Sequence, residues 1–111
     1  MSQNQENFKR GTAELLVLHL LTKEELYGYQ IVQAIEGKSE GAYTMQEGSL
    51  YPVLYRLADA GYISEYTKLV GKRRTRKYYR LEDAGRQYYE KILADYVVIT
   101  DSIDKILDRQ I

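Results

Sequence analysis

The sequence predicts a mainly α-helical domain with one small β-hairpin and a long C-terminal helix. Apolar residues recur at helical spacing over most of the chain, one segment has the composition of paired strands, and a heptad pattern follows it. The length of 111 residues suits a single domain with one modest core. We expect residues 1–81 to form this domain and residues 82–111 to form the C-terminal helix, packed as one unit with the first helix.

Two helices are expected in the first third of the chain. Over residues 8–21, leucines recur densely enough to indicate one largely buried helix. Thr22 followed by Glu25 resembles a capping box, which would open a second helix that Gly37 ends. The glycine-rich and polar residues 37–41 are typical of a loop.

A third helix is expected to run to Ala60, and two start signals compete for it. A capping box formed by Thr44 and Glu47 would place Pro52 in the helix interior, where a proline removes a hydrogen bond. A start near Gly48 would place the proline in the tolerated first turn. We favour this later start for the regular part of the helix.

Residues 62–69 and 75–81 predict two strands joined by a turn, with Tyr78 and Tyr79 on opposite faces. Sixteen Lys and Arg balance sixteen Asp and Glu, yet seven of the basic residues lie on this hairpin with no acid among them: Lys68, Lys72, Arg73, Arg74, Arg76, Lys77 and Arg80. The rest of the chain is therefore acidic. Such a charge block indicates a tail or an interaction surface, and the interleaved tyrosines favour the surface.

Glu82 and Asp83 open the last predicted helix, where acids complement the helix dipole. Its apolar positions alternate in spacings of three and four residues and form a heptad seam: Tyr89, Ile92, Tyr96, Ile99, Ile103 and Ile106. A regular seam packs on another helix, and a symmetric homodimer is the default outcome. The alternative is that the stripe packs on the first helix of its own chain, and a mixture of both contacts stays open.

Several functional classes are disfavoured. The chain has no cysteine, so it has no disulfide, thiolate metal site or Cys nucleophile. His19 stands alone, which favours a packed or partly exposed histidine over a metal ligand. No catalytic triad or phosphate loop can be assembled, so we expect no catalytic residue, no cofactor and no enzyme. The polar N-terminus and the lack of a long apolar run predict a soluble, cytoplasmic protein without a membrane partner.

Three helices followed by a basic hairpin is the order of elements in a winged helix-turn-helix domain. There the third helix enters the major groove and the hairpin approaches the flanking backbone or the minor groove. Gln46, Ser49, Tyr51 and Tyr55 of the third helix would reach base edges or phosphates, and the hairpin cations would neutralise phosphates. A dimeric small-molecule sensor or protein-interaction module, whose basic hairpin binds an acidic protein, is the alternative.

Three segments resemble the PadR family of bacterial transcriptional regulators. They are Leu26–Ile31, Glu47–Leu57 with Gly61–Ile63, and Arg76–Leu81 with Ala84–Arg86. The resemblance covers roughly positions 10 to 107 and is specific, because the three motifs occur in the family's order and spacing. The single C-terminal helix is similar to that of the short-tailed subfamily.

The resemblance implies a homodimeric repressor, often autoregulatory, that binds a pseudo-palindromic operator in double-stranded DNA and is released by a small molecule. It implies dimerisation through the helix that begins at Glu82. It also implies DNA contacts from the third helix and the hairpin. With the residues chosen above, the expected DNA-binding set is Gln46, Ser49, Tyr51, Pro52, Tyr55, Lys72, Arg73, Arg74, Arg76 and Lys77.

A ligand cavity is a further hypothesis. Some short-tailed members bind flat aromatic drugs between a pair of Trp residues on the two C-terminal helices, and Tyr96 aligns with that Trp. The tyrosine ring is smaller and carries a hydroxyl. We hypothesise that Tyr96, with Leu93, Val97 and Phe8, lines a cavity for a small aromatic effector. The alternative is that Tyr96 only packs, with its hydroxyl bound to a partner.

Overall fold

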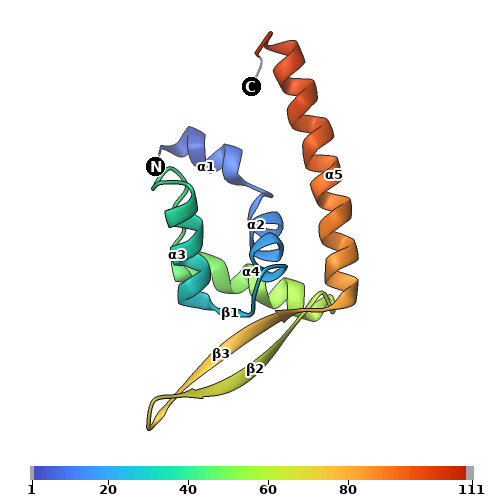
Figure 1. The fold of residues 1–111 in the computed structure, drawn as a ribbon. Coiled ribbons are helices and arrows are strands. Elements are labelled where there is room, and N and C mark those ends of the chain that lie inside the picture. The colour runs from blue at the N-terminus through green and yellow to red at the C-terminus, as the bar shows by residue number, and fades with distance from the viewer. Residues whose placement is uncertain (1, 110–111) are drawn as a thin grey trace.

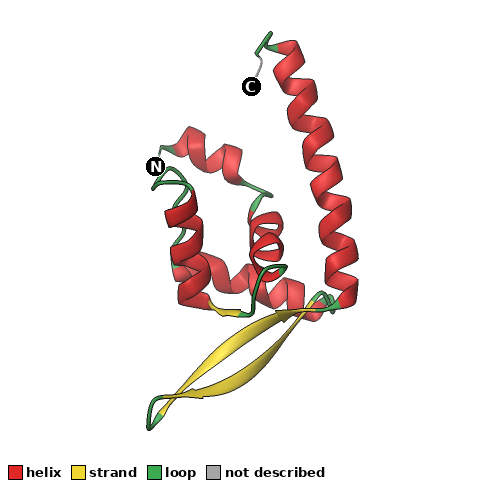
Figure 2. Cartoon of the chain, viewed as in Figure 1, coloured by secondary structure: helices red, strands yellow, loops and turns green. Residues whose placement is uncertain are grey.

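The fold of residues 2–109, which the computed structural model describes, is helical with one three-stranded antiparallel sheet (Figure 1). This confirms the predicted fold class. The elements are α1 (Gln3–Lys9), α2 (Ala13–Leu21), β1 (Leu26–Tyr27), α3 (Gly28–Lys38), α4 (Glu47–Asp59), β2 (Ile63–Val70), β3 (Arg74–Leu81) and α5 (Asp83–Ile106). Figure 2 shows that the β2–β3 hairpin and the far half of α5 extend away from the core in different directions.

The core lies around α2, which packs against α3, α4, β3 and α5. Leu18, Ile31 and Leu54 are fully buried at its centre. Tyr79 of β3 closes one side, and its buried hydroxyl has no hydrogen-bond partner among the residues described. Burial raises the pKa of Tyr79 to about 12, so the phenol stays neutral. Leu26 of β1 and Ile63 of β2 are buried in the same core, so each strand of the sheet is anchored to the helices.

The expected first helix is wrong as a continuous element. Gly11 has a left-handed φ of 87°, and it separates α1 from α2. This conformation is costly for residues with a Cβ but not for glycine. The chain therefore turns at Gly11, and α1 packs none of its residues into the core.

The expected capping box at Thr22 and Glu25 is also wrong. Residues 26–27 instead form β1 and pair with β3, and α3 begins only at Gly28. The Tyr27 amide donates to Gln30 Oε1 at 3.1 Å. Glu25 is not available for capping, because its carboxylate binds side chains of the hairpin described below.

Helix α4 begins at Glu47, slightly earlier than the favoured start. Pro52 consequently lies inside the helix and not in its first turn, which corrects our expectation. The carbonyl that the proline ring would crowd belongs to Gly48, which has open space where a side chain would be. The helix therefore continues through Pro52 to Asp59.

The predicted hairpin is confirmed to within one residue at each strand end. Strands β2 and β3 pair from Ile63 with Leu81 to Val70 with Arg74, and β3 lies between β1 and β2 in the sheet. Tyr79 enters the core whereas Tyr78 lies on the outer face, as the alternation predicted. The basic residues of β3 are thus divided between two faces of the sheet.

Helix α5 leaves the hairpin through a tight junction. A Cβ at Gly85 would lie 1.9 Å from the carbonyl oxygen of Tyr62, which accepts a hydrogen bond from the Glu82 amide. The ring of Tyr88 stacks on that of Tyr62 with centroids 4.2 Å apart. These contacts fix the direction in which α5 leaves the core.

We expect Gly85→Ala to lower the free energy of unfolding by about 2 kcal/mol, because the added methyl meets backbone that cannot move without shifting the hairpin. Gly37→Ala is the matched control. Gly37 is also helical and has open space at its Cβ position, so alanine should leave stability unchanged or raise it by up to about 1 kcal/mol. Urea unfolding at one protein concentration compares the two. Equal stability of the two variants would show that the backbone at Gly85 does not lie as close to the Tyr62 carbonyl oxygen as the structure has it.

The heptad seam of α5 is covered only in its first part. Tyr89 and Ile92 pack against the core, whereas Ile99 and Ile103 are 58% and 47% exposed. The packing of the stripe within its own chain thus ends before Tyr96, which is itself exposed. The remaining seam positions face no described residue that covers them.

Candidate nucleic-acid interface

Helix α4 places four candidate residues on its exposed side. Its inner side buries Leu50, Val53, Leu54 and Leu57 in the core. The spacing of three residues then leaves the following side chains at the surface: Gln46, Ser49, Pro52 and Tyr55. The burial of the leucines therefore fixes which face of α4 a second molecule can reach.

Tyr51 is placed differently from the other α4 candidates. It is half-buried, its hydroxyl donates to Glu47 Oε2 at 3.3 Å, and it lies against Gly28, where a Cβ would come within 3.0 Å of the hydroxyl. Burial and the neighbouring carboxylate raise the pKa of Tyr51. Its ring stacks beside that of Tyr55 with centroids 6.2 Å apart. Tyr51 thus supports the exposed face from one edge.

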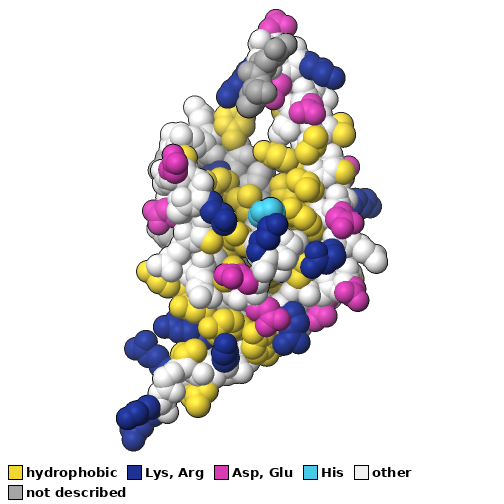
Figure 3. All heavy atoms as spheres, in the orientation of Figure 1, with side chains coloured by type: hydrophobic (Ala, Val, Ile, Leu, Met, Phe, Trp, Pro, Cys, Tyr) yellow, Lys and Arg dark blue, Asp and Glu magenta, His cyan; other side chains and the backbone are white. Residues whose placement is uncertain are grey.

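The tip of the hairpin carries the basic residues with no bound counter-charge. Lys72, Arg73 and Arg74 are exposed at the turn, which Gly71 enables with a φ of 70°. The side chains of these three residues have no ion pair, hydrogen bond or ring contact with a residue in the described part of the chain. Figure 3 shows Lys and Arg gathered at this end of the molecule, with acidic side chains over the helical body.

Arg76 and Lys77 lie on opposite faces of β3 and are both engaged. The Arg76 guanidinium lies over the ring of Tyr27, 4.4 Å from its centroid. Lys77 Nζ is 3.6 Å from Glu65 Oε1, and both side chains are about half exposed. These two candidates are therefore held close to the hairpin, while the three cations at the tip extend beyond it.

Sequence reasoning missed an aromatic ladder on the outer face of the sheet. Tyr66 and Tyr78 are cross-strand partners with stacked rings, and Lys68 and Arg80 lie over them. The alternation of the two strands could have indicated this face. The ladder makes the hairpin stiffer by covering one side of a two-stranded ribbon.

Glu25, in the segment between α2 and β1, links the aromatic ladder of the hairpin to the helical part of the domain. Its carboxylate accepts a hydrogen bond from the hydroxyl of Tyr66 and lies 3.3 Å from Arg80 Nε. The hydrogen bond to Glu25 raises the pKa of Tyr66. No sequence signal could have found Glu25, because the contact joins two elements far apart in the chain.

The candidate ligand residues do not all share one cavity. Leu93 and Tyr96 line a hollow of about 310 Å³ between α2 and α5, with Tyr89 and His19 beside them. His19 Nδ1 and the hydroxyl of Tyr89 are hydrogen-bonded at 2.6 Å. Val97 and Phe8 lie outside this hollow and are exposed. Within one chain, only half of the proposed set is therefore brought together.

Two further findings bear on other classes of site. Across residues 2–109, no group of three or more His, Cys, Asp and Glu side chains is arranged to hold a metal ion. The same residues include no helix with the length and hydropathy needed to cross a bilayer.

Residues 17–91 match the transcriptional regulator PadR-like family. An uncharacterized protein of Lysinibacillus sphaericus is 28% identical over 89% of this chain and 91% of its own length. The negative transcriptional regulator PadR of Bacillus subtilis is 30% identical over 78% of this chain, which spans 48% of that longer protein.

Solved structures agree with the sequence comparison. A transcriptional regulator from Clostridium thermocellum superposes with a TM-score of 0.82, at 30% identity, over 89% of this chain and 96% of its own. The Bacillus subtilis PadR crystal structure, in complex with operator DNA, matches with a TM-score of 0.67 at 30% identity, over 77% of this chain and 48% of its own. The helices, the hairpin and their order are therefore shared with solved regulators.

Proposed function

Because the chain belongs to the PadR-like family of transcriptional regulators, we propose that it is a homodimeric repressor that binds a pseudo-palindromic operator in double-stranded DNA. The observation that carries the proposal is the set of three cations at the hairpin tip that have no bound counter-charge among residues 2–109. The family is one of transcriptional regulators and not of enzymes, which confirms the expectation that the protein is not an enzyme. The proposal also places the protein in the cytoplasm, together with its operator.

The exposed face of α4 suits the major groove. Ser49 and Gln46 offer hydrogen-bonding groups at the start of the helix, where recognition helices contact base edges. Tyr55 is 55% exposed further along the same face and suits contact with a sugar or phosphate. The α4 face would thus read sequence, while the hairpin tip contributes charge.

The hairpin tip suits the phosphate backbone. Lys72, Arg73 and Arg74 can each neutralise a phosphate without first breaking an ion pair, since they have none among the described residues. The rings of Tyr66 and Tyr78 stack across the two strands and stiffen the hairpin that carries the tip. The tip charges can therefore reach the backbone beside the groove that α4 occupies.

A homodimer formed through α5 would supply a second α4 helix and hairpin, which bind the second half-site of the operator. The seam from Tyr96 to Ile106 is apolar and exposed, and a second copy of the same helix would cover it with matching residues. Two copies would present two α4 helices and two basic tips to the same side of DNA. The acidic body would limit indiscriminate binding along the duplex.

Binding of the wild-type protein to the DNA upstream of its own gene tests this function. Fluorescence anisotropy should find tighter binding to that DNA than to a shuffled sequence of equal length. Affinity should fall as the salt concentration rises. The logarithm of affinity should fall linearly with the logarithm of salt concentration, with a slope of about 0.9 for each phosphate contacted. Equal affinity for both sequences would contradict operator recognition, and binding to an acidic protein would then become the better account of the basic hairpin.

Release by a small aromatic effector is the second part of the proposal. The hollow beside Leu93 and Tyr96 has a mainly apolar lining that includes three tyrosine rings, and in a dimer it would adjoin the partner helix. Phe8 and Val97, exposed in one chain, would be available to complete it. A flat ring could then lie against Tyr96.

We expect Tyr96→Ala to weaken the binding of planar aromatic compounds by about fivefold, because a stacked ring pair is worth about 1 kcal/mol beyond its burial. Changes in tyrosine fluorescence on titration measure the affinity. Tyr29→Ala is a control, since Tyr29 is similarly exposed on α3 and lines no part of the hollow. If Tyr96→Ala and wild type bind equally, Tyr96 is only a packing residue.

A further inference from the structure

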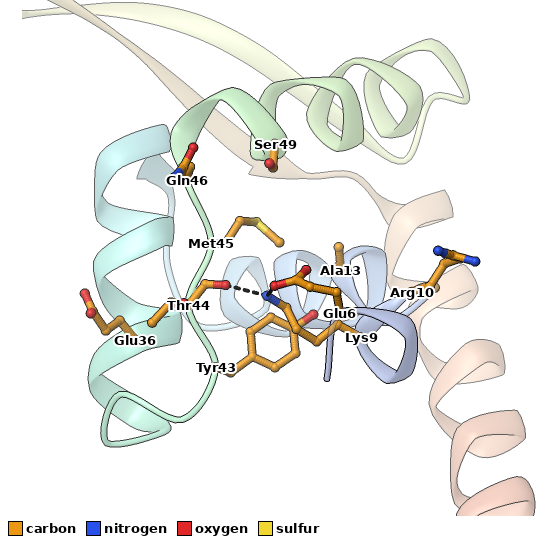
Figure 4. Close-up of a pocket in the computed structure, with 11 residues that line it drawn as sticks. Glu6, Lys9, Arg10, Ala13, Glu36, Tyr43, Thr44, Met45, Gln46 and Ser49 are labelled. Carbon is orange, nitrogen blue, oxygen red and sulfur yellow. Dashed lines mark hydrogen bonds and ion pairs between the residues drawn. The ribbon is translucent and has the colours of Figure 1, made fainter. Parts of the chain in front are cut away.

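Helix α1 is joined to the rest of the domain by an unusually well-covered lysine. None of its residues is buried, and Phe8 is 85% exposed, yet the side chain of Lys9 is only 16% exposed. Lys9 Nζ donates to the carbonyl oxygen of Thr44 at 2.6 Å and lies 4.7 Å from the ring centroid of Tyr43 (Figure 4). Glu6 Oε1 lies 3.3 Å from the same ammonium.

These contacts hold the loop that leads into α4. Thr44 lies two residues before Gln46, the N-cap residue that directly precedes α4. The hydroxyl of Tyr43 is hydrogen-bonded to Thr12 Oγ1 at 2.6 Å, and its amide donates to Ser39 Oγ at 3.0 Å. Thr12, between α1 and α2, and Ser39, at the end of α3, thus hold Tyr43 of this loop by hydrogen bonds from two sides.

The start of α4 depends on this loop because local capping does not fix it. The side chain of Gln46 makes no capping hydrogen bond to the first turn of the helix. Between α1 and the loop is a hollow of about 610 Å³, which Gln46 and Ser49 also line. Tyr43 and Met45 pack against the core on either side of Thr44, and the Lys9 side chain, at the edge of the hollow, ties the Thr44 carbonyl between them to α1.

We infer that Lys9 is a positioning residue for DNA recognition: its ammonium ties the Thr44 carbonyl to α1 and so sets where the first turn of α4 lies. The inference rests on the proposed function, since it assigns α4 as the reading helix. A charged donor on a carbonyl and a ring face gives a strong, directional tie. Base contacts fail when a side chain is displaced by about an ångström, so losing the tie should cost specificity before it costs stability.

The test compares Lys9→Met with Arg10→Met. Both substitutions remove one positive charge from the same helix end, and methionine keeps an unbranched apolar stem. Arg10 lines the same hollow, but among the described residues its guanidinium donates to Asn7 of the preceding helix α1 alone, at 3.3 Å. General electrostatic attraction to DNA should therefore fall equally in both variants, which isolates the effect of the tie.

We expect Lys9→Met to reduce the preference for operator over shuffled DNA by roughly tenfold, and Arg10→Met to leave this ratio unchanged. Affinity for shuffled DNA, which depends on the hairpin charges, should be the same in both variants. A purely structural role would lower both affinities together. An unchanged ratio in Lys9→Met would overturn the inference.

Hydrogen exchange without DNA provides a second readout that does not depend on the proposed function. The amides of Tyr43, Ser49 and Leu50 should exchange faster in Lys9→Met than in Arg10→Met, because the first bonds to Ser39 and the other two close the first turn of α4 on Gln46. Equal exchange would also overturn the inference. If wild type lacks operator preference but exchange still differs, the proposed function fails while the tie between α1 and α4 stands.

Discussion

Substitution of Ile99 by glutamate is expected to convert the protein to a monomer at micromolar concentration and to weaken operator binding by at least about a hundredfold. Ile99 lies at the middle of the uncovered seam and is 58% exposed. In a dimer formed through the seam, each new carboxylate would be buried without a counter-charge among apolar side chains of the partner helix. A monomer can occupy one half-site only, and it loses the high effective concentration at which a dimer presents its second α4 helix and hairpin to the other half-site.

Val98→Glu is the matched control for this experiment. Val98 is the neighbouring residue, is 63% exposed, and lies off the heptad seam. It gains the same charge on the same helix, and we expect it to remain dimeric and to bind DNA as wild type does. Sedimentation velocity gives the oligomeric state, and circular dichroism verifies that both variants fold. If Ile99→Glu sediments as wild type does, the α5 seam is not the dimer interface.

Replacing Arg73 and Arg74 together by alanine is expected to weaken DNA binding by roughly a hundredfold at physiological salt. Each lost phosphate contact reduces the slope of log affinity against log salt by about 0.9, so a dimer that loses four contacts should lose about 3.6. Shuffled DNA should be affected as strongly as operator DNA, because phosphate contacts carry no sequence information. Anisotropy titrations at four or five salt concentrations measure both quantities.

The control for the tip removes two positive charges elsewhere. Lys91→Ala with Lys105→Ala makes the same change in net charge, but on α5 and away from the hairpin. We expect this variant to keep the wild-type slope of log affinity against log salt. If this slope falls by the same amount in both double variants, binding depends on net charge alone, and the hairpin tip does not contact the phosphates.

The total charge of zero concealed this arrangement. The protein has sixteen basic and sixteen acidic residues, and its basic block lies on one hairpin. The structure further divides the block: Arg76, Lys77 and Arg80 have partners on the two faces of the sheet, and Lys72, Arg73 and Arg74 extend from the turn. The sequence could indicate the block, but the partners of its members depend on strand register and on Glu25.

Elements with strong local patterns could be predicted from the sequence. The hairpin was located to within one residue because branched and aromatic residues alternate there, and α5 because six apolar positions keep a heptad spacing. The break at Gly11 could not be predicted, since a glycine within a leucine-rich segment is compatible with a continuous helix. The false capping box at Thr22 failed for a related reason: pairing of residues 26–27 with β3 outweighs a local cap.

The candidate site divides in the same way. Exposure of Gln46, Ser49 and Tyr55 follows from the helical period, because the apolar positions between them must be buried. The hydrogen bond from Lys9 to the Thr44 carbonyl joins residues 35 positions apart, and no local sequence pattern indicates it. Contacts of this kind depend on how helices pack, which sequence periodicity does not determine.

Hydroxyl-radical footprinting on the DNA upstream of the protein's own gene tests operator binding by a dimer most directly. We expect two protected half-sites, related by a two-fold axis and about one helical turn apart, with weaker protection at the flanks where the hairpin tips lie. Protection of the flanks should vanish in the Arg73→Ala, Arg74→Ala protein. A single protected half-site, or uniform protection with no preferred sequence, would contradict a dimeric operator-binding regulator.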